Sequence, residues 1–497
     1  MRFSHSASRR FPARRMLALV SAATGILGGG CSGPEPIPPS DIYAPLPYNP
    51  APLPQPVPPP EPRPTPAPLP TPPPVSHAHI QLGIDVLAAQ NFSILQGKRV
   101  GLLTHKAGVN AAGVSTIEVL RHAPGVKLVA LYAPEHGIDG TVVADDNTIP
   151  KLQKDPQTGL PLYELFNTPQ GDFRKPTPDM LADIDVMVVD LQDLGTRSYT
   201  FISCLLCTME ACFEQNKTVV VLDRPNPLGG LRVGGPIIED QWMSYVGAFH
   251  VPYVHGLTIG ELARIAKENP GIMPNPAKLD SPVLKRLFTV APDVWRRGKL
   301  IVVSMGGWRR SMQWADTGLN WVPTSPNIKT PEAAVGYGLT GLDSAGGIGH
   351  FGLGVGPAEP YQFRLLNYSP HIPPDQLAAA LTALKLPGLS FMPLAYGEKN
   401  EKSGVYVAVT DWNAVVPTQL AFELMKLDAA WTKSGNPYMR ADESKAHNFC
   451  IYVGSDAWWR EISTKGRLAN VDGYFKLWNE QDAEYQQWTR QWWLYQP

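Results

Sequence analysis

Short apolar runs alternate with amphipathic stretches along the chain from residue 81 onward. Stretches 113–123 and 199–216 carry apolar residues at helical spacing. The intervening runs, rich in Val and Leu, are 98–104, 126–134, 185–195, 217–227 and 300–310. Strands this apolar are buried on both faces, so the alternation predicts an α/β fold built on a doubly wound parallel sheet.

The pattern changes beyond residue 329. Gly-rich loops, short strands such as 403–410 and C-terminal helices replace the regular alternation. This change predicts two units, a first domain over 80–329 and a second, α+β subdomain over 330–497. An inter-domain cleft between the two units is the expected place for a ligand.

The N-terminal part of the chain predicts targeting and spacing rather than fold. Residues 1–31 combine a basic stretch, an apolar stretch and small residues before Cys31. This order is typical of a bacterial lipoprotein-type signal segment with Cys31 as the lipidated residue, and ordinary signal-peptidase cleavage nearby is the alternative. Residues 32–79 form a Pro-rich linker, which predicts an extended polyproline II spacer.

A lipid anchor followed by a stiff spacer predicts a domain held off a membrane surface. The expected location is therefore the cell envelope, on the periplasmic side and lipid-anchored. Ser32 rather than Asp follows Cys31, which favours the outer membrane.

Charge and motifs exclude several classes of partner. Charged residues make up 18% of the chain and the net charge is −1, so no field attracts nucleic acid. No G-x-G-x-x-G or P-loop follows any predicted strand, so no nucleotide cofactor is expected.

Three of the cysteines, Cys204, Cys207 and Cys212, lie in a helical pattern. They are expected to be buried residues rather than a redox pair or a metal-binding motif, while a disulfide to Cys450 stays open.

Polar residues gather where the predicted strands end. Open α/β sheets bind ligands beyond the carboxyl ends of their strands, although turns and helix caps also favour Asp and Asn. The four ends in succession hold several carboxylates and an arginine, which favours a ligand site. Their residues are Thr104, His105 and Lys106; Glu135 and His136; Asp190, Gln192 and Asp193; and Asp223, Arg224 and Asn226.

A family likeness is carried by motifs in order along residues 80–497: GKRVGLLTHKAGV, YAPEHG, VVDLQDLGTRSYTFIS, VVVLDRPNPLGG, HGLTIGELA, GWRRSMQWADTGLNWVPTSPN and GSDAWWREI. The chain resembles exo-β-N-acetylmuramidases of the NamZ type, bacterial glycoside hydrolases that remove terminal N-acetylmuramic acid from peptidoglycan fragments. The resemblance implies a Rossmann-like domain plus a second subdomain, with the active site in the cleft. The partner that the resemblance implies is peptidoglycan or muropeptide glycans, and the absence of nucleotide motifs and metal-ligand spacing predicts no cofactor and no metal.

The resemblance also implies site residues. The glutamate of the Pro-Glu-His-Gly motif falls on Glu135, the expected catalytic acid, and apolar neighbours can keep such a carboxyl protonated. Asp190 and Asp193 are the candidates for a second catalytic carboxylate because they follow a neighbouring predicted strand, and not because of the resemblance. Arg197 or Arg224 can bind the lactyl carboxylate of muramic acid, or else form structural ion pairs. The expected substrate-binding residues are His105, His136, Gln192, Arg197, Tyr199, Arg224, Asn226, His255 and Asn327.

One segment departs from the family pattern. Where the family carries a Glu-Gly-Arg-Gly-Thr-like loop, residues 341–359 keep the glycines but not the Glu and Arg. His350, Asp343 or Glu359 are candidates to replace them. The altered loop favours an alternative function, a catalytically lapsed family member that binds peptidoglycan. A metallohydrolase using the strand-end histidines is a weaker alternative, because no metal-ligand spacing supports it.

Overall fold

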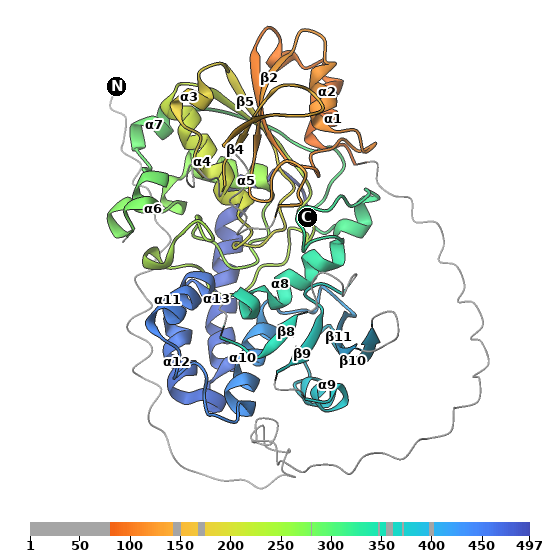
Figure 1. Cartoon of the computed structure of the whole chain (residues 1–497), viewed down its shortest axis with the longest axis vertical. Coiled ribbons are helices and arrows are strands. Elements are labelled where there is room, and N and C mark those ends of the chain that lie inside the picture. The colour runs from red at the N-terminus through yellow and green to blue at the C-terminus, as the bar shows by residue number, and fades with distance from the viewer. Residues whose placement is uncertain are drawn as a thin grey trace, which may run out of the picture.

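The computed structural model describes residues 80–142, 151–166, 174–279, 281–345, 348–353, 361–369, 372–396 and 402–497. Cys31, the Pro-rich linker and Glu359 lie outside the described residues. Two sheets organise the described chain, one in each half of the molecule (Figure 1).

The first sheet has seven strands in the order β3-β4-β2-β1-β5-β6-β7. All its neighbouring strands pair in parallel except β3, which pairs antiparallel with β4 at one edge. The strand order reverses at β1, which lies between β2 and β5, so the predicted doubly wound α/β sheet is confirmed. The strands are β1 (Arg99–Thr104), β2 (Lys127–Ala133), β3 (Leu152–Lys154), β4 (Pro161–Glu164), β5 (Val186–Asp190), β6 (Thr218–Leu222) and β7 (Lys299–Val303).

Helices cover both faces of this sheet (Figure 1). One face packs on a core to which α4 and α5 contribute, and the other packs on a core that includes α1 and α2. Burial on both faces explains why the strands read as continuous apolar runs. The helices of this half are α1 (Gly83–Ala89), α2 (Thr116–Arg121), α3 (Pro178–Leu181), α4 (Phe201–Glu214), α5 (Ile259–Glu268), α6 (Pro282–Leu287) and α7 (Pro292–Arg297).

The second half contains an antiparallel sheet of four strands in the order β10-β11-β9-β8, with its own apolar core. This arrangement confirms the predicted α+β subdomain. Its strands are β8 (Phe351–Leu353), β9 (Leu365–Tyr368), β10 (Leu389–Tyr396) and β11 (Lys402–Val409). Its helices are α8 (Pro331–Ala345), α9 (Pro374–Ala383), α10 (Gln419–Trp431), α11 (Glu443–Val453), α12 (Ala457–Lys465) and α13 (Val471–Thr489).

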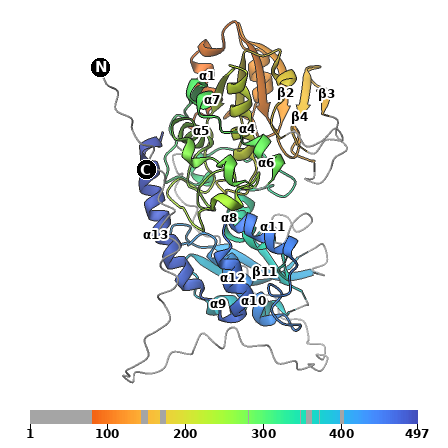
Figure 2. The same cartoon turned by 90° about the vertical axis from the view of Figure 1, so that its left-hand side faces the viewer.

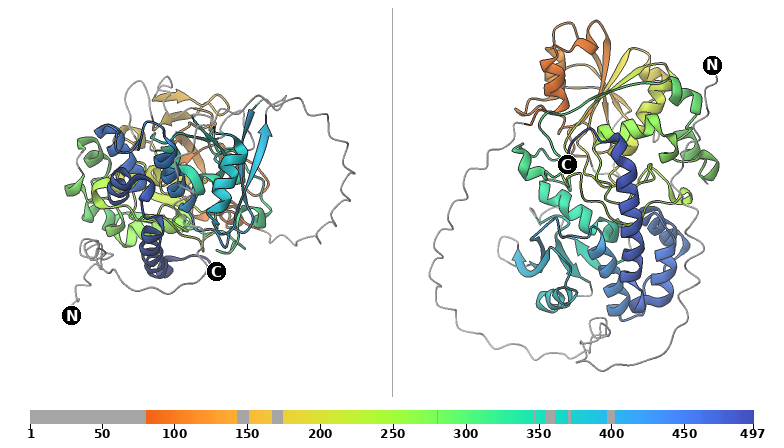
Figure 3. Two further views of the ribbon diagram at one scale, coloured as in Figure 1. Left: turned by 90° about the horizontal axis from the view of Figure 1, so that it is seen from below. Right: turned by 180° about the vertical axis from the view of Figure 1, so that it is seen from behind.

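The end of the chain returns from the second half to the first. Helix α13 runs along both halves and leaves the C-terminus beside the first sheet's domain (Figures 2 and 3). There the Tyr495 hydroxyl donates to Asp223 Oδ2 at 2.6 Å, and the Met305 amide donates to the same hydroxyl at 2.9 Å. The predicted division at residue 330 did not anticipate this docking.

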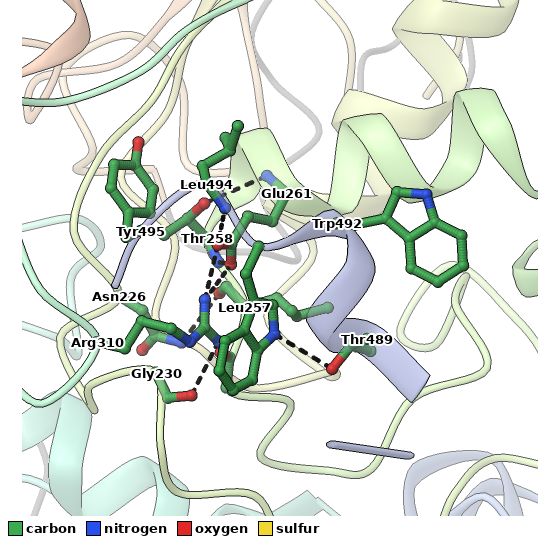
Figure 4. Close-up of polar contacts among 12 residues, drawn as sticks. Asn226, Gly230, Leu257, Thr258, Glu261, Arg310, Thr489, Trp492, Leu494 and Tyr495 are labelled. Carbon is green, nitrogen blue, oxygen red and sulfur yellow. Dashed lines mark hydrogen bonds and ion pairs between the residues drawn. The ribbon is translucent and has the colours of Figure 1, made fainter. Parts of the chain in front are cut away.

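A buried ion pair lies under the returning tail (Figure 4). Arg310 Nη1 contacts both carboxylate oxygens of Glu261 at 2.6 and 2.7 Å, and the Arg310 guanidinium lies 3.8 Å from the centre of the Trp493 ring. The Leu494 amide donates to the same carboxylate at 2.9 Å. The tail therefore completes the hydrogen bonds of a charge that is removed from water.

The four cysteines of the described chain, Cys204, Cys207, Cys212 and Cys450, are free and buried. Three of them lie in α4, as the helical pattern predicted. Within the part of the chain that the structure describes, no helix is both long enough and apolar enough to cross a membrane.

Candidate active site

His105 lies at the switch point of the sheet, just after β1. The Gln192 amide, beyond the neighbouring β5, donates to His105 Nε2 at 3.1 Å, and the ring of Phe201 packs edge-on against the imidazole at 4.8 Å. Burial lowers the pKa of His105 to about 3, and the charges of Arg224 and His136 add to the effect. His105 is therefore a neutral ring that holds the β5 end in place.

Asp190 and Arg224 form a buried ion pair at the same edge. Arg224 donates to both oxygens of Asp190, at 2.5 Å from Nε and 2.9 Å from Nη2, and the Thr116 hydroxyl donates to Oδ2 at 2.5 Å. Arg224 Nη2 also donates to the Val109 carbonyl at 2.6 Å. These contacts form a structural ion pair, which was one of the two alternatives for Arg224. They use both oxygens of Asp190 and the guanidinium of Arg224.

A cavity of about 30 Å³ adjoins this pair. Arg224 and Gln192 line it together with Asn110, Trp314 and Asn320. The volume holds about one water molecule, far less than a sugar ring requires.

Asp193 keeps one oxygen available. Its Oδ2 accepts from the Gly195 amide at 2.8 Å and lies 3.4 Å from His255 Nε2. The Leu257 amide donates to His255 Nδ1 at 3.2 Å, and His255 Nε2 is buried without a hydrogen-bond partner among the described residues. Among the described residues, Asp193 Oδ1 is buried and has no hydrogen-bond partner. Of the two predicted second carboxylates, Asp193 is the one with an oxygen to offer.

Glu135 follows β2 in a tight loop. His136 and Gly137 both have left-handed backbone, with φ of 75° and 73°, so the glycine meets a conformational need there. His136 Nδ1 lies 2.8 Å from the Val142 carbonyl oxygen, which ties the two ends of the loop together. The loop is thereby fixed with the half-buried Glu135 carboxyl facing α4.

Thr200, at the N-cap of α4, donates its hydroxyl hydrogen bond to Glu135 Oε2. Helix N-termini favour negative charge, so the place suits a carboxylate. The sequence analysis did not select Thr200, although it stands directly before the helix in the RSYT stretch.

Three buried tyrosines lie within electrostatic reach of the Glu135 carboxylate. Burial raises the pKa of Tyr199, Tyr245 and Tyr337, and the charge of Glu135 adds to the rise in all three. Asp193 acts on Tyr199 in the same way, so both carboxylates lie within electrostatic reach of this one ring. Tyr199 also donates to the Thr324 carbonyl at 3.2 Å, which brings the PTSPN stretch to the site.

Both halves of the molecule contribute to this region. Tyr337 belongs to α8, and its hydroxyl lies 2.9 Å from Ser198 Oγ just before α4. Ser198 in turn donates to Tyr253 at 3.0 Å. The predicted inter-domain cleft stays a prediction, but the side chains that would line it come from both domains.

Two family models match most of the chain. The model for the N-terminal part of the exo-beta-N-acetylmuramidase NamZ matches residues 100–332, and the model for its C-terminal part matches residues 347–495. The chain belongs to the NamZ family. The resemblance read from the motifs is thus confirmed.

One relative in sequence and two solved structures are also similar to this chain. The peptidoglycan beta-N-acetylmuramidase NamZ of Bacillus subtilis is 37% identical over 338 residues, which cover 67% of this chain and 73% of that protein. A DUF1343 family protein of Bacteroides fragilis superposes with a TM-score of 0.68 at 36% identity, over 84% of this chain and 100% of that one. A second DUF1343 family protein of that organism, 21% identical with a TM-score of 0.59 over 84% and 99%, shares the fold.

Three other residues that were predicted to bind substrate either hydrogen-bond to backbone groups or face solvent in this NamZ-family chain. Arg197 donates to the carbonyls of Pro236, Val251, Tyr452 and Val453 at 2.6 to 3.1 Å, so its guanidinium joins the two domains. Asn226 bonds to the Leu257 carbonyl and the Leu228 amide, both at 3.0 Å. Asn327 is exposed in a turn. None of these contacts involves the Glu135 region.

Glu164 is a carboxyl near the site that sequence reasoning missed. It ends β4, opposite Ala133 of β2, and is 4% exposed. A Cβ on Gly137, in the Glu135 loop, would lie 3.9 Å from Glu164 Oε2. Burial raises the pKa of Glu164 to about 7, against a hydrogen bond from Gln153 at 3.2 Å that lowers it, and Asp139 raises it further.

The altered loop begins inside the second domain. Asp343 lies beside Asp428, whose Oδ1 accepts from the His350 amide at 2.9 Å. Burial raises the pKa of both carboxyls, that of Asp343 to about 7. Asp343 and Asp428 therefore form a buried pair of carboxyls at the base of the altered loop. Among the described residues no three His, Cys, Asp or Glu side chains group as metal ligands.

Proposed function

We propose that this NamZ-family protein is a glycosidase that releases terminal N-acetylmuramic acid from peptidoglycan fragments or glycan-chain ends. Family membership and the named activity of the Bacillus relative support a peptidoglycan glycosidase. The observation that carries the proposal is the carboxyl of Glu135, which accepts the Thr200 hydroxyl hydrogen bond within a group of tyrosines.

Glu135 acts as the general acid. Thr200 donates to Oε2, so the proton for the leaving oxygen is carried on Oε1. As that proton moves to the glycosidic oxygen, the bond to the anomeric carbon breaks and positive charge develops on the sugar ring. The Glu135 carboxylate that results keeps the Thr200 hydrogen bond and the favourable helix N-terminus.

Asp193 supplies the second carboxylate. The Gly195 amide donates to its Oδ2, which leaves the buried Oδ1 to act on the anomeric carbon, directly or through a water molecule. Asp190 is not used, because Arg224 and Thr116 engage both of its oxygens.

The protein acts in the cell envelope in this proposal. A lipid on Cys31 holds it to a membrane, with the outer membrane favoured, and the linker over 32–79 spans the distance to the wall. At about 3.1 Å per residue in polyproline II, such a linker reaches on the order of 100 Å.

The test is turnover of the disaccharide MurNAc-GlcNAc and of a chromogenic β-muramide by the full chain. Glu135→Gln is expected to lower kcat by about 100- to 10,000-fold, the usual contribution of a general acid. Glu118→Gln, an exposed residue on α2 that pairs with Arg121, is the matched control and is expected to keep full activity.

Two outcomes contradict the proposal. Full activity in Glu135→Gln removes the assigned acid. Binding of glycan fragments without turnover by the unaltered chain favours the catalytically lapsed family member, with the altered loop at 341–359 as the explanation.

A further inference from the structure

The surface at the end of α13 carries a hollow of about 420 Å³. This volume falls in the range of about 300–1,000 Å³ that is usual for small-molecule sites. Both domains form the hollow, since α13 and the tail that follows it meet the loop after β6 of the first sheet there. The residues that line it are Leu231, Gln486, Arg490, Trp493 and Pro497.

Three of the lining side chains project from one face of the last helical segment. Gln486, Arg490 and Trp493 stand at positions i, i+4 and i+7, and α13 continues into a short 3₁₀ turn over Arg490–Trp492. Residues at this spacing share one face of a helix. An amide, a guanidinium and an indole therefore form a row of about 10 Å, at 1.5 Å per residue.

The indole of Trp493 is held in place from the protein side. Arg310 is buried and its guanidinium lies 3.8 Å from the centre of the ring, and Trp493 Nε1 donates to Thr489 Oγ1 at 3.3 Å (Figure 4). The ring itself is only half-buried, so its remaining surface lines the hollow. The C–H groups on the face of a pyranose ring can pack on such a fixed aromatic surface.

Polar groups beside the indole keep hydrogen-bonding capacity. Gln486 Nε2 donates to the Leu231 carbonyl at 2.8 Å, which fixes the amide and leaves its Oε1 to accept from a sugar hydroxyl or an acetamido N–H. Arg490 is exposed, and its guanidinium lies 5.7 Å from the centre of the Trp493 ring. Among the described residues, this guanidinium has no ion pair and no hydrogen bond, so its donors are available to a ligand.

The charge of the hollow matches a glycan that carries carboxylates. Arg490 is the one charged side chain among the lining residues. Each muramic acid residue of peptidoglycan bears a lactyl carboxylate, or a peptide linked to it that ends in carboxylates. A guanidinium binds a carboxylate through two parallel hydrogen bonds, and the neighbouring indole offers a surface for the sugar ring. The row of side chains therefore suits a muramyl residue of a glycan strand.

Helix α13 separates the hollow from the proposed active site. Tyr485, directly before Gln486, is buried and donates to the His255 carbonyl at 3.1 Å. The inner side of the helix thus faces the Asp193 region, while Gln486 lines the hollow on another side. A glycan bound in the hollow would lie against this wall without filling the region of Glu135.

We propose that the hollow is a second binding site for peptidoglycan, in which Trp493 packs on a sugar ring and Arg490 pairs with a carboxylate of a muramyl residue. The proposal rests on the proposed function in one respect, because it takes peptidoglycan as the polymer on which the protein acts. Two sites on one polymer bind it more tightly than either site alone, so the hollow raises the affinity for long glycan strands more than for a single muramide.

The experiment measures binding of the full chain to insoluble peptidoglycan sacculi by co-sedimentation. Arg490→Gln is expected to weaken binding about 3- to 10-fold, because a charge-assisted pair contributes less at a site open to solvent. Leu231→Glu, at a residue that is 38% exposed, adds a carboxylate to the hollow and is expected to weaken binding at least as much. Arg296→Gln, with a 78% exposed side chain, and Leu468→Glu, at a 69% exposed residue, are the matched controls and are expected to bind like the unaltered chain.

Equal binding by the two hollow variants and their controls overturns the proposal. A loss on chitin as large as that on sacculi in Arg490→Gln also overturns it, because chitin has no lactyl carboxylate. If Leu231→Glu changes the oligomeric state in light scattering and keeps sacculi binding, the hollow is an interface between copies of the chain instead. The proposed function fails separately, when the unaltered chain does not turn over the soluble β-muramide, and the binding comparison then still decides the role of the hollow.

Discussion

Replacing Glu164 by Gln is expected to change how the stability of the protein depends on pH. Glu164 is buried at the end of β4 beside the Glu135 loop, and burial raises its pKa from 4.5 to about 7. A carboxyl whose pKa is raised on folding holds its proton more tightly in the folded state. Its stabilising contribution is complete below about pH 4.5 and is lost as the pH rises through 7.

The size of the effect follows from the same shift. A rise from 4.5 to about 7 corresponds to roughly 3 kcal/mol in the free energy of unfolding between acid and alkaline conditions. Gln has nearly the same shape, carries no charge and can still accept the hydrogen bond of Gln153. Glu164→Gln is therefore expected to match the unaltered protein near pH 4 and to be more stable by about 1–3 kcal/mol near pH 8.5.

Urea unfolding followed by tryptophan fluorescence measures this difference at each pH. Other buried carboxyls titrate in the same range, Asp223 with a pKa of about 6 among them, so the informative quantity is the difference between variant and unaltered protein. Glu118→Gln, at an exposed position, is expected to show no such slope. A difference for Glu164→Gln that is the same at both pH values refutes the reasoning.

Two further predictions concern the tail and the acid. Tyr495→Phe removes the hydrogen bond to Asp223 and leaves the Met305 amide without its acceptor. The free energy of unfolding, measured by thermal or urea unfolding, should therefore fall by about 1–3 kcal/mol. An unchanged unfolding midpoint would show that the tail does not stabilise the first domain. Thr200→Val should lower kcat about tenfold on the β-muramide with little change in KM, and Thr200→Ser should restore it; equal activity in both variants would remove Thr200 from the site of Glu135.

The central strands could be predicted because they are buried on both faces, as β5 is along its whole length. β1, β2, β5 and β6 each fall inside an apolar run that the sequence shows directly, and β7 begins one residue before its run. β4 has only four residues and begins with Pro161, so neither length nor alternation marked it, and Glu164 was missed with it. The signal for a strand lies in its local pattern, and a four-residue strand has almost none.

The roles of the strand-end residues depend on contacts that no local pattern records. Asp190 and Asp193 stand three positions apart in one motif, yet Arg224 pairs with the first and His255 with the second. The docking of Tyr495 on Asp223 joins residues 272 positions apart. Family motifs predict where the site lies, but the proposed division between structural and chemical carboxylates rests on the three-dimensional contacts.

Release of free N-acetylmuramic acid from glycan strands, followed by mass spectrometry, tests the central claim most directly. The unaltered chain is expected to release it and to expose N-acetylglucosamine at the strand end, while Glu135→Gln releases it at least about 100-fold more slowly. Equal release by the two proteins would contradict the assignment of Glu135 as the acid, and no release by either would contradict the proposed activity itself.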